Sequence, residues 1–478
     1  MKKVYLLFIF VLCASSTWGQ TLTDIDTDKI FSLEDYLAWV REHHPVARQA
    51  LLLQVEADAE LMKARGNFDP KLYGDYEQKS FDGKNYFQIG EAGVGIPTWF
   101  GADLKASYNW TDGIFLNEEA TLPDAGQIVA GINMPLLQGM MFDERRAQVQ
   151  QAQLIQELNA ADRRALFNDL LMDAVEVYWN WVYDYNVLQI FQEALDLAQQ
   201  RFEITRESFF QEDMPAIDTL EAFIQVQNRL VDLADAQVNV DNSILDISNF
   251  LWYEEVLPLK IIAPLRPEAL AVFESPDYDN QVATWINNLE TIHPDLQAIQ
   301  AKQEQLEIKE RLKREYLKPR LDAEYNFLSG GFDFLYTSNG DDAQLSALLT
   351  DNYKWGLTFN FPLFLRKERA GLQLVQIEQL STQYKFNNKE WEIENKITML
   401  FQQLETTEQQ IAVSEDMLQN YRTLLAAENE KFRFGESSIF LLNSREQKLI
   451  ESQLKLRKLQ ADYKKLQSKV AWAAGQLQ

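Results

Sequence analysis

Residues 397–432 read ITMLFQQLETTEQQIAVSEDMLQNYRTLLAAENEKF and carry an apolar residue at every seventh position. These residues are Ile397, Leu404, Ile411, Leu418, Leu425 and Phe432. A seam of period seven predicts a helix that supercoils left-handedly against neighbouring helices. A second seam includes polar residues, which favours packing among several helices over a simple dimeric coil: Leu400, Thr407, Ser414 and Tyr421.

The same seam occurs once more, 223 residues earlier in the chain. Its members are Ala174, Trp181, Leu188, Leu195, Phe202 and Phe209. No proline interrupts residues 147–209 or 370–432, so each copy predicts one helix of about 95 Å. Because helices of globular proteins average about 11–12 residues, this length indicates a coiled-coil or helical-barrel assembly.

Other landmarks indicate that the whole chain is an internal repeat. A His-Pro pair precedes a second proline by 25 residues in both copies, from Pro45 to Pro70 and from Pro294 to Pro319. We read the two His-Pro pairs as helix architecture. The predicted divisions are a first repeat, 20–252, a proline-rich linker, 253–279, and a second repeat, 280–478.

Shorter helices complete each repeat. Ser32 is a candidate cap for a helix that ends near Arg65, and its counterpart spans about 282–317. After each long helix we expect a break, at 211–215 and 434–438, and a return helix, at about 216–251 and 439–474.

Segments of period two lie between the helices and predict β-strands. In the clearest one, Leu104, Ala106, Tyr108 and Trp110 alternate with polar residues. The first repeat has four such segments, 72–81, 86–96, 102–111 and 128–134, and the second repeat has 321–327 and 355–361. Their length and their apolar-out alternation fit tilted transmembrane strands of roughly 9–11 residues.

Any one of these segments, taken alone, also fits a soluble sheet with one wet face. In lipid, however, an open sheet edge leaves backbone groups unsatisfied at a cost of several kcal/mol each. One chain supplies too few strands to close a barrel, so we expect several subunits to share one. The polar loops 111–126 and 329–352 are then extracellular, and Asp341-Asp342 is read as solvated loop.

The N-terminus predicts export. Lys2 and Lys3 precede an apolar run, and small residues follow before Gln20. This order is typical of a secretory signal peptide, which we assign to residues 1–19. The only cysteine, Cys13, lies inside it, so the predicted mature chain has neither disulfides nor thiolate metal sites.

Charge and composition argue against several other classes. The formal net charge is −27, which opposes nucleic-acid binding because phosphates require Lys and Arg. The three histidines, His43, His44 and His293, suggest no metal site, and no nucleophile constellation is visible. We therefore expect no enzyme, no metal and no cofactor.

The layout of two repeats, each with a short helix, strands, a long helix, a turn and a return helix, resembles the TolC-like outer-membrane efflux family. The first turn, Phe209-Phe210-Gln211-Glu212-Asp213-Met214-Pro215-Ala216-Ile217-Asp218, is similar to that family's F-x-x-G-D-x-x-x-x-D hinge. The second turn keeps the glycine, Gly435, whereas the first has Glu212 in its place. The resemblance covers essentially the whole predicted mature chain.

The resemblance implies a mixed α+β membrane protein and a homotrimer. Its strands would form one shared transmembrane β-barrel among outer-membrane lipids, continued by a long periplasmic α-helical coiled-coil barrel. The family has four strands per subunit, so this chain either adds strands to the barrel or extends a hairpin beyond it. The residues predicted to face lipid are Leu104, Tyr108, Trp110, Tyr325, Phe327, Trp355 and Phe359.

The implied function is a passive exit duct of a tripartite efflux or type I secretion system in the cell outer membrane. An inner-membrane transporter supplies the energy, and a periplasmic adaptor docks on the helical tips. Candidate docking and gating residues flank the two turns: Phe209, Glu212, Asp213, Asp218, Phe432, Gly435 and Glu436. The alternative that the sequence leaves open is a periplasmic or surface coiled-coil scaffold without a pore.

Overall fold

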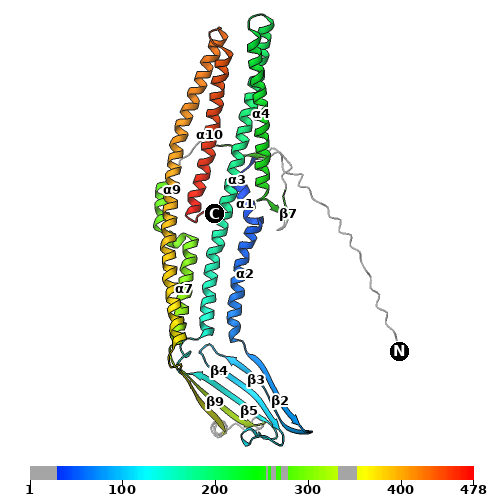
Figure 1. Cartoon of the computed structure of the whole chain (residues 1–478), viewed down its shortest axis with the longest axis vertical. Helices are drawn as coiled ribbons and strands as arrows, with labels where there is room; N and C mark the ends of the chain where they lie inside the picture. The colour runs from blue at the N-terminus through cyan, green and yellow to red at the C-terminus, as the bar shows by residue number, and fades with distance from the viewer. Residues whose placement is uncertain (1–29, 254–256, 260–264, 271–277, 332–351, 478) are drawn as a thin grey trace, which may run out of the picture.

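The structure is a computed structural model that describes residues 30–253, 257–259, 265–270, 278–331 and 352–477. The predicted signal peptide, residues 1–19, and Asp341-Asp342 lie outside these residues. A β-sheet forms one end of an elongated molecule, and long helices run from it to the opposite end, where two helical turns lie (Figure 1). The C-terminus lies about halfway along the helices.

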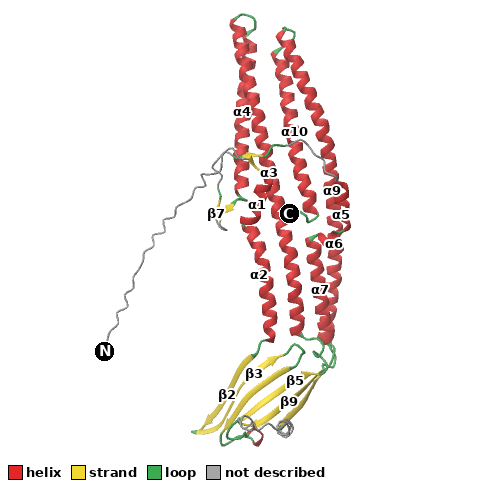
Figure 2. Cartoon of the chain, turned by 180° about the vertical axis from the view of Figure 1, so that it is seen from behind, coloured by secondary structure: helices red, strands yellow, loops and turns green. Residues whose placement is uncertain are grey.

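The first repeat contains four α-helices. They are α1 (Leu33–His43), α2 (Pro45–Arg65), α3 (Glu144–Phe210) and α4 (Ala216–Ser248). Helix α3 has 67 residues, which corresponds to about 100 Å. Helix α2 packs along the part of α3 nearer the sheet, and α4 packs along the far part (Figure 2).

The second repeat follows the same plan. Its helices are α5 (Tyr278–Asn287), α6 (Leu289–Ile292), α7 (Pro294–Glu315), α9 (Arg366–Arg433) and α10 (Ile439–Ala473). Helix α9 has 68 residues and packs against α7 near the sheet and against α10 beyond it. The two long helices that the heptad seams predict are therefore confirmed.

The predicted seams form the cores of the two repeats. Trp181 and Ala174 are buried in the first, and Ile397, Leu404 and Ile411 are buried in the second. The polar positions Thr407 and Ser414 of the second seam are also buried, because α9 contacts α7, α10 and α5 rather than a single partner. Toward the turns the seam becomes more exposed, and Phe209 is 38% exposed.

The first helix of each repeat is interrupted, where the sequence predicted one continuous helix. One interruption in each repeat falls at the His-Pro pair, since a proline at the first helical position disfavours helix in the residue before it, and the second repeat has a further one at Asn288. His44 caps α2 by accepting a hydrogen bond from Val46 N at 3.2 Å, and His293 caps α7 in the same way from Asp295 N at 3.2 Å. Both histidines therefore serve helix architecture, as predicted.

The main sheet has six antiparallel strands in the order β10-β9-β5-β4-β3-β2. They are β2 (Lys71–Phe81), β3 (Lys84–Pro97), β4 (Asp103–Asp112), β5 (Gln127–Pro135), β9 (Arg320–Gly330) and β10 (Tyr353–Asn360). The predicted strand segments are thus confirmed, and β5 pairs with β9 to join the two repeats. The 3-10 helices η1 (Gly66–Phe68) and η2 (Glu118–Ala120) lie in the connections.

Two short pairings lie near the middle of the helices. Strand β1 (Ile30–Phe31) pairs in parallel with β8 (Arg266–Pro267), and β6 (Trp252–Tyr253) pairs with β7 (Leu257–Pro258). The C-terminal residues are attached to α3 by Asn168, whose side chain donates to Trp472 O and accepts from Leu477 N. The ends of the described chain are therefore fastened to the helices rather than to the sheet.

We predict that stability falls as the pH drops below about 6.5, the ordinary pKa of histidine. Burial lowers the pKa of both His44 and His293, so the unfolded chain binds protons that the folded chain does not. The His293→Asn variant, which keeps a capping acceptor, should lose part of this slope. Melting midpoints between pH 5 and 8 in detergent test this, with His43→Asn as a control. Equal slopes in all three proteins would contradict it.

Candidate functional site

One face of the six-stranded sheet is mainly apolar from edge to edge, and polar residues that the register places on it lie at the ends of β2, β3 and β4 away from the helices: Gln78, Gln88 and Asp112. Directly paired residues share a face, and the register places Leu104 beside Ile132, Ile132 beside Tyr325, and Tyr325 beside Trp355. The predicted lipid-facing residues are all brought onto this face by the pairing: Leu104, Tyr108, Trp110, Tyr325, Phe327, Trp355 and Phe359. The structure therefore assembles one apolar surface from both repeats.

The apolar face also explains one glycine. Gly90 pairs with Trp110, and a Cβ at Gly90 would lie 2.1 Å from the indole ring. The ring therefore covers the glycine, and the neighbouring Tyr108 stacks on Trp110 with ring centroids 5.8 Å apart. A larger residue at position 90 would displace the indole.

The opposite face of the sheet is polar. Lys105 Nζ lies 2.6 Å from Glu324 Oε1, and Asn326 donates to the same oxygen at 2.9 Å. The charged residues that the register places on this face are close to balanced in sign: Lys71, Lys79, Lys105, Arg320 and Lys354 with Asp75, Glu77, Glu91, Asp103, Asp322 and Glu324. The sheet is thus amphipathic, with a polar and nearly neutral second face.

The two edge strands, β2 and β10, are exposed at every residue. Leu72 is 85% exposed and Phe359 is 66% exposed. Within the described chain, each edge strand has a neighbour on one side only, so half of its backbone groups point outward. These edges are the open ends of the sheet.

The two helical turns at the far end share one hydrogen-bonding pattern. In the first, Asp213 N donates to Ser208 O at 3.0 Å and Glu212 N donates to Phe209 O at 3.0 Å. In the second, Glu436 N donates to Lys431 O at 2.9 Å and Gly435 N donates to Phe432 O at 3.0 Å. This pattern is the Schellman motif, which requires a left-handed residue after the helix.

Glu212 takes the left-handed conformation that Gly435 takes in the second turn. Its φ is 64°, and that of Gly435 is 74°. A side chain raises the energy of this conformation by about 1–2 kcal/mol. The first turn therefore has the same shape as the second although glycine is replaced.

The predicted tip residues lie where the sequence placed them, on two separate hairpins at the same end of the molecule. Glu212, Asp213, Gly435 and Glu436 are exposed, and Asp218 is half-buried. Sequence reasoning missed Phe210 and Phe434, which are 74% and 80% exposed. Their position, apolar but outside the heptad register and beside a turn, was the available clue.

A buried ionic contact joins the two hairpins near their tips. The guanidinium of Arg201 on α3 contacts the carboxylate of Glu446 on α10 and donates to Asn443 Oδ1 at 3.0 Å. The side chains of Arg201 and Glu446 are 16% and 6% exposed. Close by, the buried Arg229 of α4 donates to Gln447 of α10 at 2.7 Å. The partners are more than 200 residues apart in the chain, and no periodicity or motif in the sequence indicates these contacts.

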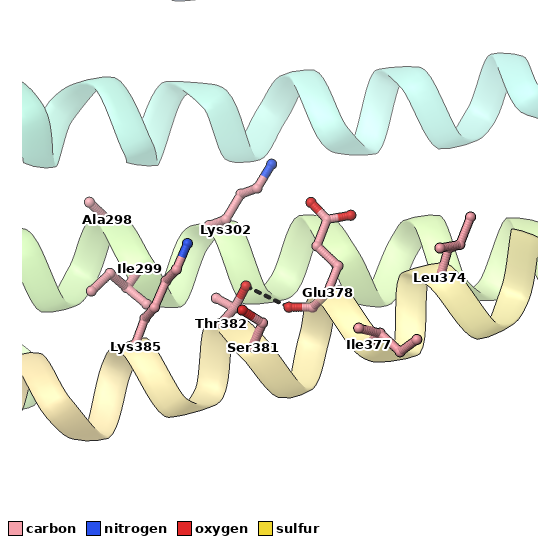
Figure 3. Close-up of a pocket in the computed structure, with 9 residues that line it drawn as sticks. All are labelled: Ala298, Ile299, Lys302, Leu374, Ile377, Glu378, Ser381, Thr382 and Lys385. Carbon is pink, nitrogen blue, oxygen red and sulfur yellow. Dashed lines mark hydrogen bonds between the residues drawn. The ribbon is translucent and has the colours of Figure 1, made fainter.

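A groove of about 480 Å³ lies between α7 and α9 (Figure 3). Leu374 and Ile377 line it and are 66% and 56% exposed. Lys302 and Lys385 also line it. Its lining is therefore partly apolar, with two basic residues and one acidic residue, Glu378.

Other helices carry exposed apolar stripes at helical spacing. On α2 the stripe is Leu52, Val55 and Met62, and on α4 it is a heptad series of Ile217, Ile224, Val231, Val238 and Leu245. Isolated exposed apolar residues are ordinary, but contiguous stripes mark surfaces that bind a partner. None of the described helices combines the length and the apolarity that a membrane crossing requires. In the described part of the chain, no three His, Cys, Asp or Glu side chains are grouped to hold a metal ion.

The architecture is similar to that of solved outer-membrane channels. The Campylobacter jejuni CmeC outer membrane channel superposes with a TM-score of 0.65 at 14% identity, covering 93% of this chain and 86% of that one. The Vibrio cholerae outer membrane protein VceC gives 0.65 at 14% identity, covering 93% and 97%. The open state of the Neisseria gonorrhoeae MtrE outer membrane channel gives 0.65 at 13% identity, covering 93% and 89%. These similarities establish the fold.

Residues 285–476 match the outer membrane efflux protein family. This match covers less than half of the chain, while nearly the whole chain shares the fold of the solved outer-membrane channels, which confirms the resemblance inferred from the sequence. No curated protein matches the chain. The matched family consists of outer membrane efflux proteins and the similar structures are outer-membrane channels, in agreement with the predicted location in the cell outer membrane.

We predict that Glu212→Gly stabilises the protein by about 0.5–1 kcal/mol, because glycine removes the left-handed strain of the first turn. The matched reverse change, Gly435→Glu, should destabilise it by about 1–2 kcal/mol. Denaturation midpoints of the purified protein in detergent measure both. A destabilised Glu212→Gly variant would show that Glu212 makes a contact worth more than the strain.

Proposed function

We propose that the protein is the outer-membrane channel subunit of a tripartite efflux or type I secretion system. Three copies share one transmembrane barrel, and their helices continue it as a tunnel through the periplasm. The observation that carries the proposal is the amphipathic sheet with open edges, since such a sheet is stable in lipid only when it is closed. A coiled-coil scaffold without a pore would not require an amphipathic sheet with open edges.

The directions of the edge strands support closure by identical copies. Five antiparallel steps separate β10 from β2, so the two edges run in opposite directions. β10 of one subunit can therefore pair antiparallel with β2 of the next, and the apolar faces remain continuous. The number three comes from the similarity to the family.

The helices offer matching surfaces at the same junction. Because β2 follows α2 and β10 precedes α9, pairing of the strands brings α2 of one subunit beside the α7–α9 groove of the next (Figure 3). The stripe Leu52, Val55 and Met62 fits the apolar part of the groove. The exposed Glu56 of α2 complements Lys302 and Lys385 in charge.

The far ends of the helices would form the gate and the adaptor site. The exposed aromatic residues Phe210 and Phe434 give the tips apolar surface for a periplasmic adaptor, beside the predicted docking residues. An inner-membrane transporter would drive the substrate into the tunnel. The contact between Arg201 and Glu446 holds the two hairpins of one subunit together, so loosening it is a route to opening.

The function is tested by reconstituting the purified mature chain in planar bilayers. We expect detergent dependence, a trimer and discrete conductance steps. A chain that stays a soluble monomer without detergent would exclude the proposal. N-terminal sequencing of the exported protein tests the predicted cleavage before Gln20.

We predict that Val231→Glu weakens the trimer. A charge in the middle of the exposed α4 stripe would have to be buried without a partner, which costs several kcal/mol. Light scattering in detergent should reveal dissociation at concentrations where the wild type is trimeric. Gln237→Glu, an exposed position on another side of the same helix, is the control. A trimer of unchanged stability would rule out this stripe as an interface.

We predict that Glu446→Gln opens the tunnel. Removing one charge of a buried pair leaves Arg201 uncompensated and weakens the joint between the hairpins by on the order of 3 kcal/mol. Single-channel recording should show a several-fold higher open probability. The control is Glu451→Gln, which alters an exposed carboxylate on the same helix. If both variants conduct like the wild type, the contact does not hold the gate.

A further inference from the structure

Among the described residues, the first repeat gives four strands to the sheet and the second gives two. The conserved landmarks match β2 with β9, through Leu72 with Leu321 and Tyr76 with Tyr325, and the prolines at 135 and 362 match the ends of β5 and β10. Strands β3 and β4 have no counterpart among the described residues of the second repeat. They form an extra hairpin between the matched strands of the first repeat.

This hairpin is built into the sheet and does not hang from it. β3 pairs with β2 along Lys71–Phe81, with one register shift between Lys79 and Ser80, and β4 pairs with β5 without a shift from the pair Asp103 and Asn133 to the pair Asn109 and Gln127. Side chains on the polar face also cross its borders, since Tyr73 of β2 donates to Glu91 of β3 at 3.0 Å and Lys105 of β4 reaches Glu324 of β9. Removing the hairpin from the sheet would break two ladders and these contacts.

The hairpin also preserves the two features that allow the barrel to close, which are antiparallel outer edges and a continuous apolar face. Two inserted strands leave the outer edges antiparallel, as they would be with four strands. The apolar face runs through the insert without a break, because Trp110 covers Gly90 and Ala106 lies between Val94 and Ala130.

We propose that the β3–β4 hairpin forms part of the barrel wall, so that each subunit contributes six strands and the trimer closes an eighteen-stranded barrel. The inference rests on the proposed function. With strands about 4.8 Å apart and tilted by about 40°, eighteen strands give a backbone cylinder roughly 36 Å across, against roughly 24 Å for twelve. Barrels of 16–18 strands hold an aqueous channel.

The consequence is that the barrel and the helical tips have different roles in the channel. The barrel becomes a wide mouth lined by the polar face of the sheet, whose charges nearly cancel. It passes polar substrates without selecting them by size. The narrowest point then lies at the helical tips, where the contact between Arg201 and Glu446 joins the hairpins.

Disulfide cross-linking tests the strand order directly, because the predicted mature chain has no cysteine. Trp355→Cys on β10 is combined in turn with Leu72→Cys, Gly74→Cys and Tyr76→Cys on β2, since the shear of the barrel sets the register. A second series combines it with Leu104→Cys, Ala106→Cys and Tyr108→Cys on β4. Trp355→Cys with Tyr325→Cys, directly paired within one subunit, is the positive control.

We expect most of the chain to run as covalent dimers and trimers for one β2 position and for no β4 position. Cross-links from β10 to β4 would mean that β2 and β3 lie outside a smaller barrel, which overturns the inference but leaves the proposed function intact. Cross-links to neither strand, with the control pair oxidised, would overturn both. Electron cryomicroscopy of the unmodified trimer is the independent measurement, and it tests a wall in which β2 pairs directly with β5 and the β3–β4 hairpin lies outside, which would give the same cross-links. Twelve strands in the wall would refute the inference.

Discussion

The structure depends on one constraint, which is that the backbone groups at the edges of the sheet need partners. Water supplies them for a soluble sheet, but the hydrocarbon of a membrane does not. β2 and β10 are exposed along their whole length and carry Leu72, Trp355 and Phe359 toward the outside. These apolar side chains suit lipid, but the unpaired backbone groups of the same strands do not. Pairing with further copies of the chain gives these backbone groups their partners and keeps the apolar side chains facing lipid.

The placement of the helices follows from the sheet. The long helices α3 and α9 cannot be stable alone, because helices of this length depend on tertiary packing. Near the sheet they are accompanied by α2 and α7, and toward the tips by α4 and α10. Each cross-section of the subunit therefore contains two helix pairs. A ring of such subunits keeps a similar wall along its whole length, as a tunnel requires.

The sequence predicted those features that depend on local periodicity. The heptad series located α3 and α9, and the alternation of Leu104, Tyr108 and Trp110 located a strand and its apolar face. It did not predict which strands pair, because alternation carries no information about neighbours, and so the role of the extra hairpin stayed open. It also missed the joint of Arg201 with Glu446, whose partners are 245 residues apart. The interruption of the first helix in each repeat could have been predicted from the His-Pro pairs, because a helix begins at each of these prolines.

The internal repeat gives this joint a further meaning. Shifted by 223 residues, Arg201 corresponds to Leu424, whereas Glu446 and Asn443 correspond to Phe223 and Leu220. In the proposed trimer, the junction within a subunit is thus ionic and the equivalent junction between subunits is apolar. Leu424, Phe223 and Leu220 are 38%, 41% and 59% exposed in the single chain, which agrees with a partner there. Neutralising a charge loosens only the junction within each subunit, while the apolar junctions keep the ring together. Opening would then move α9 and α10 against α3 and α4 inside every subunit without separating the subunits.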